Sequence, residues 1–244
     1  MGSIIAIGGG EIATAETRAI DQRAIEAAPG SAPTALFVPT ASNDAASYIE
    51  KFDAYFGDTL ECETAVLELT KTDTTVDAAR EAIAAADLIY VGGGDTAFLV
   101  DLVGVYDLLP ALREHYADGG VLMGLSAGAL CWFEYGLSDA IALEDVDFGP
   151  TACFGLIEGL DATVHADFQR RRAFRTHVER RMVPGVALGD CTAMEVRDDR
   201  YRVLTSAPTA AAFYIDPRPQ QTTVRQLPAT DDFEPLDELR DPDR

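Results

Sequence analysis

Short apolar segments alternate with amphipathic segments over the first 130 residues of the chain. Residues 4–7, 34–38, 87–91 and 121–123 are almost entirely apolar, and residues 64–69 alternate as a strand does. Apolar positions at helical spacing mark residues 17–28, 76–86 and 108–116, and segments around Phe52 and Phe98. Strands without a polar face, each followed by a helix, are typical of a parallel sheet covered on both sides. We therefore predict a three-layer α/β/α fold with a mostly parallel central sheet.

The pattern changes after residue 190. Short strands are expected at residues 193–197, 201–205 and 210–215, with turn residues between them, and they predict a small antiparallel edge on the sheet. From residue 217 the chain is rich in Pro, Asp and Glu, which favours an extended, partly disordered tail. The predicted organisation is one α/β domain over residues 1–216 and an acidic tail over residues 217–244.

A candidate nucleophile lies where the apolar segment 121–123 meets the start of a helix. The intervening residues, Gly-Leu-Ser-Ala-Gly at positions 124–128, fit the pattern Gly-x-Ser-x-Gly. A sharp strand-to-helix turn strains its central residue, exposes its side chain and directs the amino terminus of the helix toward it. The pattern favours Ser126 as a nucleophile, and a turn that merely packs tightly is the alternative.

A serine nucleophile needs a base, and the chain has three histidines. His115 and His177 fall on predicted helices, where His177 is expected to be solvated, whereas His165 ends an apolar segment and lies in a strand-end loop. We therefore choose His165 as the base. An acid must orient it. The spacing leaves four candidates between the serine and the histidine: Asp139, Glu144, Asp145 and Asp147.

Three glycine-rich turns follow predicted parallel strands, at residues 8–10, 92–94 and 124–128. The carboxyl ends of parallel strands lie on one edge of a sheet, so these turns should share a rim. The N–H of Ala127 and the amides of the turn at 92–94 are candidate donors to an oxyanion. The turns at 8–10 and 92–94 match neither the dinucleotide nor the phosphate-loop pattern.

Charge and cysteine content narrow the partners and the compartment. The formal net charge of −22 disfavours nucleic acid and anionic membranes as partners. The sequence contains no run of 18 apolar residues, so no membrane span is predicted. Only two of the 19 cations are lysines, which favours a halophilic protein over an ordinary acidic one. The four cysteines lack close spacing and metal-ligand patterns, and no signal peptide is recognised at the amino terminus. A cytoplasmic protein is expected.

The motifs together resemble the serine peptidases that include peptidase E, the aspartyl dipeptidase, and cyanophycinase. The resemblance covers about residues 1–215. Its ordered elements are residues 92–96, residues 124–129, residues 155–157 leading to His165, and residues 165–167 with Arg172 and Phe174 downstream. It implies a fold similar to class I glutamine amidotransferases, which is flavodoxin-like.

The resemblance also implies roles for residues of this chain. It makes Ser126 the nucleophile, His165 the base, and the amides of Gly93, Gly94 and Ala127 the oxyanion hole. The dipeptidase branch favours Asp139 as the acid, which we choose, and the cyanophycinase branch favours Glu144. Substrate contacts are expected from Asp95, Thr96, Asp167 and Arg172. A preference for an N-terminal Asp would need a cation, for which Arg170, Arg171 and Arg172 are candidates.

The predicted function is therefore hydrolysis of dipeptides or short peptides through an acyl-enzyme, without a cofactor or a metal. Two alternatives use the same fold: a catalytically silent protein that binds a small metabolite, and an amidase. The oligomeric state is open, and a homodimer is among the alternatives.

Overall fold

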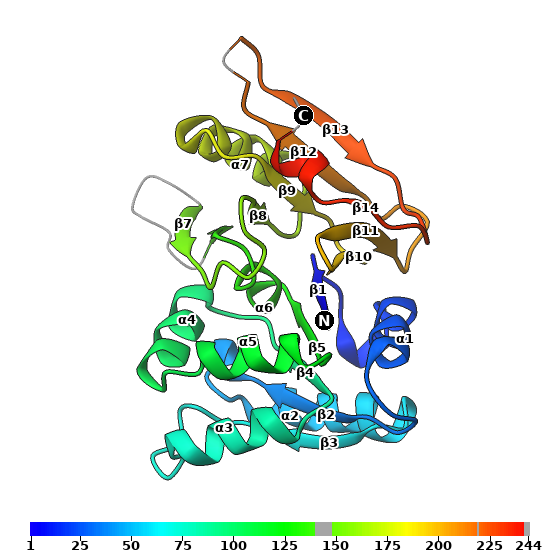
Figure 1. The fold of residues 1–244 in the computed structure, drawn as a ribbon, viewed down its shortest axis with the longest axis vertical. Coiled ribbons are helices and arrows are strands. Elements are labelled where there is room, and N and C mark those ends of the chain that lie inside the picture. Colours follow the sequence, from blue (N-terminus) through cyan, green and yellow to red (C-terminus); the bar gives the residue numbers. More distant parts are fainter. Residues whose placement is uncertain (140–147, 219, 242–244) are drawn as a thin grey trace.

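The computed structural model describes residues 1–139, 148–218 and 220–241. Its larger sheet has eight strands in the order β14-β11-β10-β1-β5-β4-β2-β3 (Figure 1). The strands from β1 to β3 in this order pair in parallel, and β10, β11 and β14 add an antiparallel edge beside β1. The strand bounds are β1 (Ser3–Ile7), β2 (Thr34–Val38), β3 (Glu63–Val66), β4 (Leu88–Val91), β5 (Val121–Leu125), β10 (Thr192–Arg197), β11 (Arg200–Thr205) and β14 (Glu234–Pro235).

Helices cover both faces of this sheet. Ile4 and Ala6 of β1 belong to the core cluster that also contains side chains of α3, α4 and α5. Ile5 and Ile7, which point to the opposite face, pack in a second cluster with α1 and α2. The predicted three-layer arrangement is confirmed. The helices are α1 (Arg18–Ala27), α2 (Ala46–Phe52), α3 (Val76–Ala85), α4 (Thr96–Val105) and α5 (Leu109–Ala117), with 3₁₀ turns at Ile12–Thr14 and Thr40–Ser42 and a π-helical segment at Asp53–Thr59.

A second sheet of six strands, in the order β13-β12-β9-β8-β6-β7, was not predicted as a separate unit. One of its faces shares the core cluster of the main sheet through Val186 and Tyr214, and the other packs on α7 through Ala187 and Phe174. In Figure 1 this sheet and α7 occupy the upper part of the view, and α2 to α5 occupy the lower part. The elements are α6 (Ala127–Leu130), β6 (Tyr135–Ser138), β7 (Gly149–Ala152), β8 (Asp161–Thr163), α7 (Phe168–Arg181), β9 (Gly185–Leu188), β12 (Ala212–Asp216) and β13 (Thr223–Leu227).

The carboxyl-terminal part of the chain differs from the sequence prediction in two ways. The strand expected at 210–215 does not join the edge of the main sheet, because β12 pairs with β9 and β13 in the second sheet. Residues 220–241 do not form an extended tail. They contribute β13, β14 and α8 (Asp237–Arg240), and they bury Leu227, Leu236 and Leu239 almost completely. These leucines stabilise the segment because their burial removes apolar surface from water.

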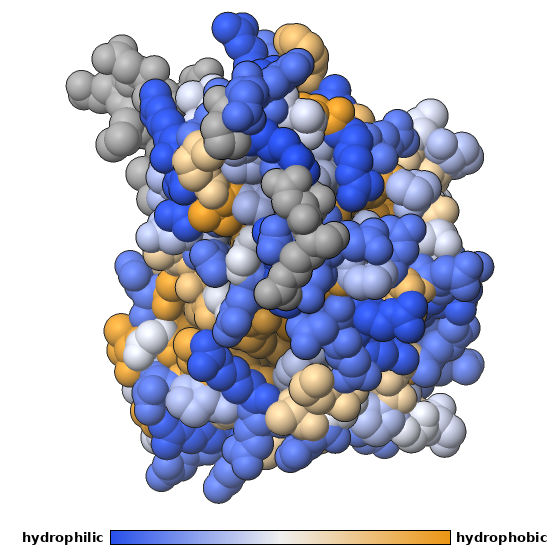
Figure 2. Space-filling view, turned by 45° about the horizontal axis from the view of Figure 1, so that its top comes forward, coloured by the Kyte–Doolittle hydropathy of each residue, from blue (hydrophilic) through white to orange (hydrophobic). Residues whose placement is uncertain are grey.

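The surface of the protein is mainly hydrophilic. Hydrophilic residues cover most of the face shown in Figure 2. Within the described parts of the chain, no helix has the length and apolarity that a membrane span requires. All four cysteines are free thiols.

Candidate active site

Ser126 lies in a strained turn between β5 and α6. Its backbone angles, φ 56° and ψ −111°, lie outside the regions that residues with side chains usually adopt. The N–H of Ser126 donates to the carbonyl oxygen of Ile7 in β1 at 2.9 Å, which fixes the turn against the neighbouring strand. A Cβ at Gly124 would collide with the carbonyl group of Gly128, and one at Gly128 with that of Val91. Both glycines are therefore required by close packing.

His165 lies within hydrogen-bond distance of this serine. Its Nε2 is 2.8 Å from Oγ of Ser126. The histidine follows β8 of the second sheet, has φ 48°, and donates its backbone N–H to the carbonyl oxygen of Gly8 after β1. Residues from the carboxyl ends of strands in the two sheets thus meet at one point.

A carboxylate from a third segment holds the other side of the imidazole ring. Asp190 lies between β9 of the second sheet and β10 of the main sheet, and its Oδ1 is 2.6 Å from Nδ1 of His165. An ionised carboxylate only accepts hydrogen bonds, so Nδ1 carries the proton and Nε2 is left to accept from the serine hydroxyl. A Cβ at Gly9 would collide with both side chains, and the first glycine turn therefore borders the pair directly.

The carboxylate that contacts His165 is not the one chosen from the sequence. Asp139 instead accepts a hydrogen bond from Nη2 of Arg170 at 2.8 Å, and the guanidinium group of Arg170 also lies 4.6 Å from the ring centroid of Phe148. Glu144, with Asp145 and Asp147, lies outside the described residues.

The acids that the sequence spacing favours all lie between the serine and the histidine, whereas Asp190 comes 25 positions after His165. The signal that could have found it is its place directly after the apolar strand β9 and Gly189, on the rim where parallel strands end.

The predicted oxyanion donors lie beside the nucleophile but are not equivalent. A Cβ added to Gly93 would lie 3.4 Å from Cβ of Ser126. The N–H of Gly93 donates to the hydroxyl oxygen of Tyr48 at 3.3 Å. Gly94 has φ 141°, and a side chain there would collide with the carbonyl group of Ala41. Among the described residues, no acceptor holds the N–H of Gly94 or that of Ala127 at the start of α6. These two amides therefore lack an acceptor within the described residues, and their part in an oxyanion hole stays a prediction.

The residues predicted to contact substrate have different environments. Asp95 and Asp167 cap α4 and α7, accepting from the N–H of Phe98 at 3.0 Å and of Arg170 at 2.8 Å. Thr96 is 0 % exposed, whereas Arg172 is exposed. Their contacts with substrate stay predictions.

The other two histidines have structural partners. His177 is buried rather than solvated. Its Nε2 lies 2.8 Å from Oδ2 of Asp161, which also accepts from Nε of Arg181 at 2.6 Å. His115 lies 3.3 Å from the carbonyl oxygen of Val121, and burial lowers its pKa.

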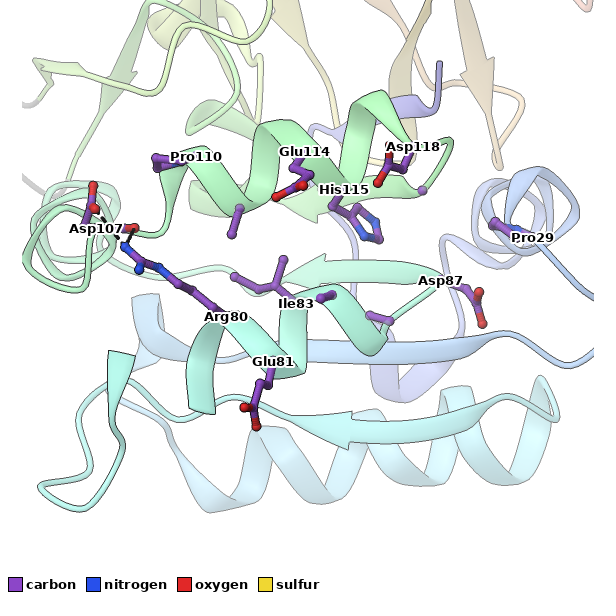
Figure 3. Close-up of a pocket in the computed structure, with 14 residues that line it drawn as sticks. Pro29, Arg80, Glu81, Ile83, Asp87, Asp107, Pro110, Glu114, His115 and Asp118 are labelled. Carbon is purple, nitrogen blue, oxygen red and sulfur yellow. Dashed lines mark hydrogen bonds and ion pairs between the residues drawn. The ribbon is translucent and has the colours of Figure 1, made fainter. Parts of the chain in front are cut away.

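A cavity of about 800 Å³ lies between α3 and α5 (Figure 3). Asp87 and Gly120, which precede β4 and β5, line it, so it opens at the amino ends of these strands. His115 lines the cavity, whereas the hydrogen-bonded residues Ser126, His165 and Asp190 are not part of its lining. Over the described ranges, no group of three or more His, Cys, Asp or Glu side chains could hold a metal ion.

Comparison with known proteins is consistent with a peptidase. The sequence model of peptidase family S51 matches residues 4–204. The uncharacterized peptidase YgaJ of Bacillus subtilis (strain 168) is 32% identical over 225 residues, which cover 88% of this chain and 92% of that protein.

Two solved structures share the fold. A peptidase from an acI-B1 Actinobacterium has a TM-score of 0.70 at 24% identity, covering 96% of this chain and 97% of that one. A putative peptidase E protein from Listeria monocytogenes EGD-e has a TM-score of 0.62 at 15% identity, covering 84% of this chain and 98% of that one.

Proposed function

Because the chain belongs to peptidase family S51, we propose that it is a serine peptidase whose catalytic residues are Ser126, His165 and Asp190. The proposed reaction is hydrolysis of dipeptides or short peptides through an acyl-enzyme. One observation carries this proposal: a continuous chain of two short hydrogen bonds, 2.8 Å from Oγ of Ser126 to Nε2 of His165 and 2.6 Å from Nδ1 to Asp190. This is the arrangement that activates a serine hydroxyl.

In the proposed acylation step, Oγ of Ser126 attacks the carbonyl carbon of the scissile bond while Nε2 of His165 takes the hydroxyl proton. Asp190 keeps the proton on Nδ1 and stabilises the imidazolium ion that forms. When the tetrahedral intermediate collapses, His165 returns the proton to the leaving amine. A water molecule then attacks the acyl-enzyme with the same histidine as base, which releases the acid product and restores the serine.

The negative charge of the tetrahedral intermediate needs donors that are already in place. The N–H groups of Ala127 and Gly94 suit this role, because neither is held by an acceptor among the described residues. Ala127 also begins α6 directly after the nucleophile. One such donor contributes roughly 10²- to 10³-fold to kcat in other serine hydrolases.

The surroundings of the site bear on the substrate. Of the three neighbouring arginines, Arg170 is paired with Asp139 and Arg171 lies over the ring of Phe213 at 4.0 Å. Arg172 is exposed and is the remaining cation for an N-terminal Asp side chain. A preference for such peptides is the specificity that we propose. The cytoplasmic location expected from the unpaired cysteines stays a prediction.

Replacement of the nucleophile tests the proposal. Ser126→Ala should lower kcat by roughly 10³-fold or more against a panel of dipeptides, because no other group replaces the serine oxygen. The matched control is Ser31→Ala, which removes the hydroxyl of an exposed serine and should leave kcat unchanged.

A fluorophosphonate probe separates a peptidase from a silent binding protein. In labelling, Oγ of Ser126 displaces fluoride from phosphorus and the hydroxyl proton passes to His165. Labelling of the wild type and of Ser31→Ala, but not of Ser126→Ala, is expected. Near-wild-type hydrolysis by Ser126→Ala, or an unlabelled wild-type protein, would contradict the assignment.

A further inference from the structure

The three-glycine turn after β4 depends on its neighbours for its conformation. Glycine has no Cβ to restrict its backbone, so the conformation of Gly92-Gly93-Gly94 must be held by outside contacts. The N–H of Gly92 donates to the carbonyl oxygen of Val38 at 3.0 Å, and that of Asp95 to Ala41 at 2.8 Å. These bonds fix the two ends of the turn.

The middle of the turn is held by a side chain. The N–H of Gly93 donates to the hydroxyl oxygen of Tyr48, on α2, at 3.3 Å. The Tyr48 ring meets that of Phe37 edge-on, with centroids 4.9 Å apart, and lies directly against Gly92. Burial raises the pKa of Tyr48, so its hydroxyl stays protonated. Tyr48 is thus a neutral acceptor at a position fixed by packing.

The position of this turn matters because it borders the nucleophile. A Cβ added to Gly93 would lie 3.4 Å from Cβ of Ser126. The N–H of the next residue, Gly94, has no acceptor among the described residues. The N–H of Gly93 is already bonded to Tyr48, which leaves Gly94 as the donor of this turn. The hydrogen bond to Tyr48 restricts φ and ψ at Gly93, and a change in these angles would rotate the following peptide, which carries the N–H of Gly94.

We infer that Tyr48 is a positioning residue for the oxyanion hole, an inference that rests on the proposed serine peptidase function. Its hydroxyl accepts from Gly93 and thereby holds the turn in the conformation that presents Gly94. Tyr48 acts through the turn and need not touch the substrate.

Tyr48→Phe removes the hydroxyl and keeps the ring that packs on Phe37. Since one oxyanion donor contributes about 10²- to 10³-fold, loss of its positioning should lower kcat for p-nitrophenyl acetate by about tenfold or more. KM should change little, because the ground-state ester carries no oxyanion. The rate of fluorophosphonate labelling should fall by a similar factor, since the phosphoryl oxygen uses the same donors.

The matched control is Tyr55→Phe. It also removes a tyrosine hydroxyl from the layer between α1, α2 and the main sheet, but that hydroxyl donates to Asp21 at 2.8 Å and does not contact the turn. Its kcat and labelling rate should match the wild type. Melting temperatures of both variants, with all rates measured well below them, separate loss of stability from loss of positioning.

The inference would be overturned by a Tyr48→Phe protein whose kcat and labelling rate stay within about twofold of the wild type, or by equal losses in the two tyrosine variants. A loss in Tyr48→Phe that appears in KM rather than kcat would also count against it. Failure of the proposed function is distinguishable, because the wild-type protein would then not be labelled at Ser126.

Discussion

Asp21 makes the stability of this protein depend on pH in a way that one substitution should remove. Its side chain, on α1, is 0 % exposed, and its Oδ2 accepts from the hydroxyls of Thr17 and Tyr55, both at 2.8 Å. The other carboxyl oxygen, Oδ1, is buried without a hydrogen-bond partner among the described residues. Burial raises the pKa of Asp21 from 3.8 to about 7, and the two hydroxyl donors offset only part of this effect.

The sign follows from comparing the folded and unfolded chains. In the unfolded chain Asp21 loses its proton near its ordinary pKa of 3.8, whereas in the folded protein it keeps the proton up to about pH 7. The folded state therefore binds more protons in this window, and its free energy of unfolding falls as pH rises from 4 to 7. A difference of about three pKa units between the folded and unfolded states lowers the free energy of unfolding by roughly 4 kcal/mol, and this loss is complete above pH 7.

Asp21→Asn keeps the shape of the side chain and an oxygen that can accept from Thr17 and Tyr55, and it does not ionise. Its free energy of unfolding, minus that of the wild type, should rise by about 2 to 3 kcal/mol between pH 5 and pH 8.5. Starting at pH 5 keeps the protein above its pI of about 4.3.

Urea unfolding at constant high KCl measures this difference, and taking variant minus wild type cancels the other titrating groups. Asp101→Asn is the control, since it removes the same formal charge at an exposed position of α4. A difference between Asp21→Asn and wild type that stays constant within about 0.5 kcal/mol over this pH range would refute the reasoning.

Two further predictions concern the acid and the net charge. Asp190→Asn should lower kcat by roughly 10²- to 10⁴-fold, because Nδ1 of His165 loses its carboxylate partner. Asp139→Asn should change kcat little, since Asp139 pairs with Arg170. If kcat on one dipeptide falls more in Asp139→Asn than in Asp190→Asn, Asp139 would be the acid, as the sequence favours. The melting temperature should rise between 0.1 M and 3 M KCl, because salt screens the repulsion among the charges behind the net −22. A melting temperature that is the same at both salt concentrations would contradict the halophilic interpretation.

The His165–Asp190 pair is accessible to solvent, which limits the electrostatic effect expected of Asp190. The side chains are 40 % and 64 % exposed, so water reaches both. In the proposed mechanism, Asp190 therefore acts mainly by selecting the tautomer and orientation of the ring, because solvent screens the charge–charge attraction between exposed groups. Its position depends on the segment between β9 and β10, which leaves one sheet and enters the other.

The sequence determined the features that short-range patterns encode. Almost entirely apolar strands, such as residues 34–38, are typical of a sheet covered on both faces, and the structure has them there. The turn around Ser126 was recognisable because Gly124 and Gly128 must be small for a strand to turn sharply into a helix. The sequence favours His165 because it ends an apolar segment, and the structure places its Nε2 2.8 Å from Oγ of Ser126.

Only the tertiary structure decided which distant groups meet. Asp139 and Asp190 both follow strands of the second sheet, and the residues around them in the sequence do not distinguish them. In this sheet β9 and β6 lie on opposite sides of β8, the strand that precedes His165. Asp190, which follows β9, is the one that contacts His165. The acidic composition of residues 220–241 concealed their few buried leucines, such as Leu239, whose partners lie far away in the sequence. Strand pairing and burial depend on contacts between remote segments, which hydrophobic periodicity does not specify.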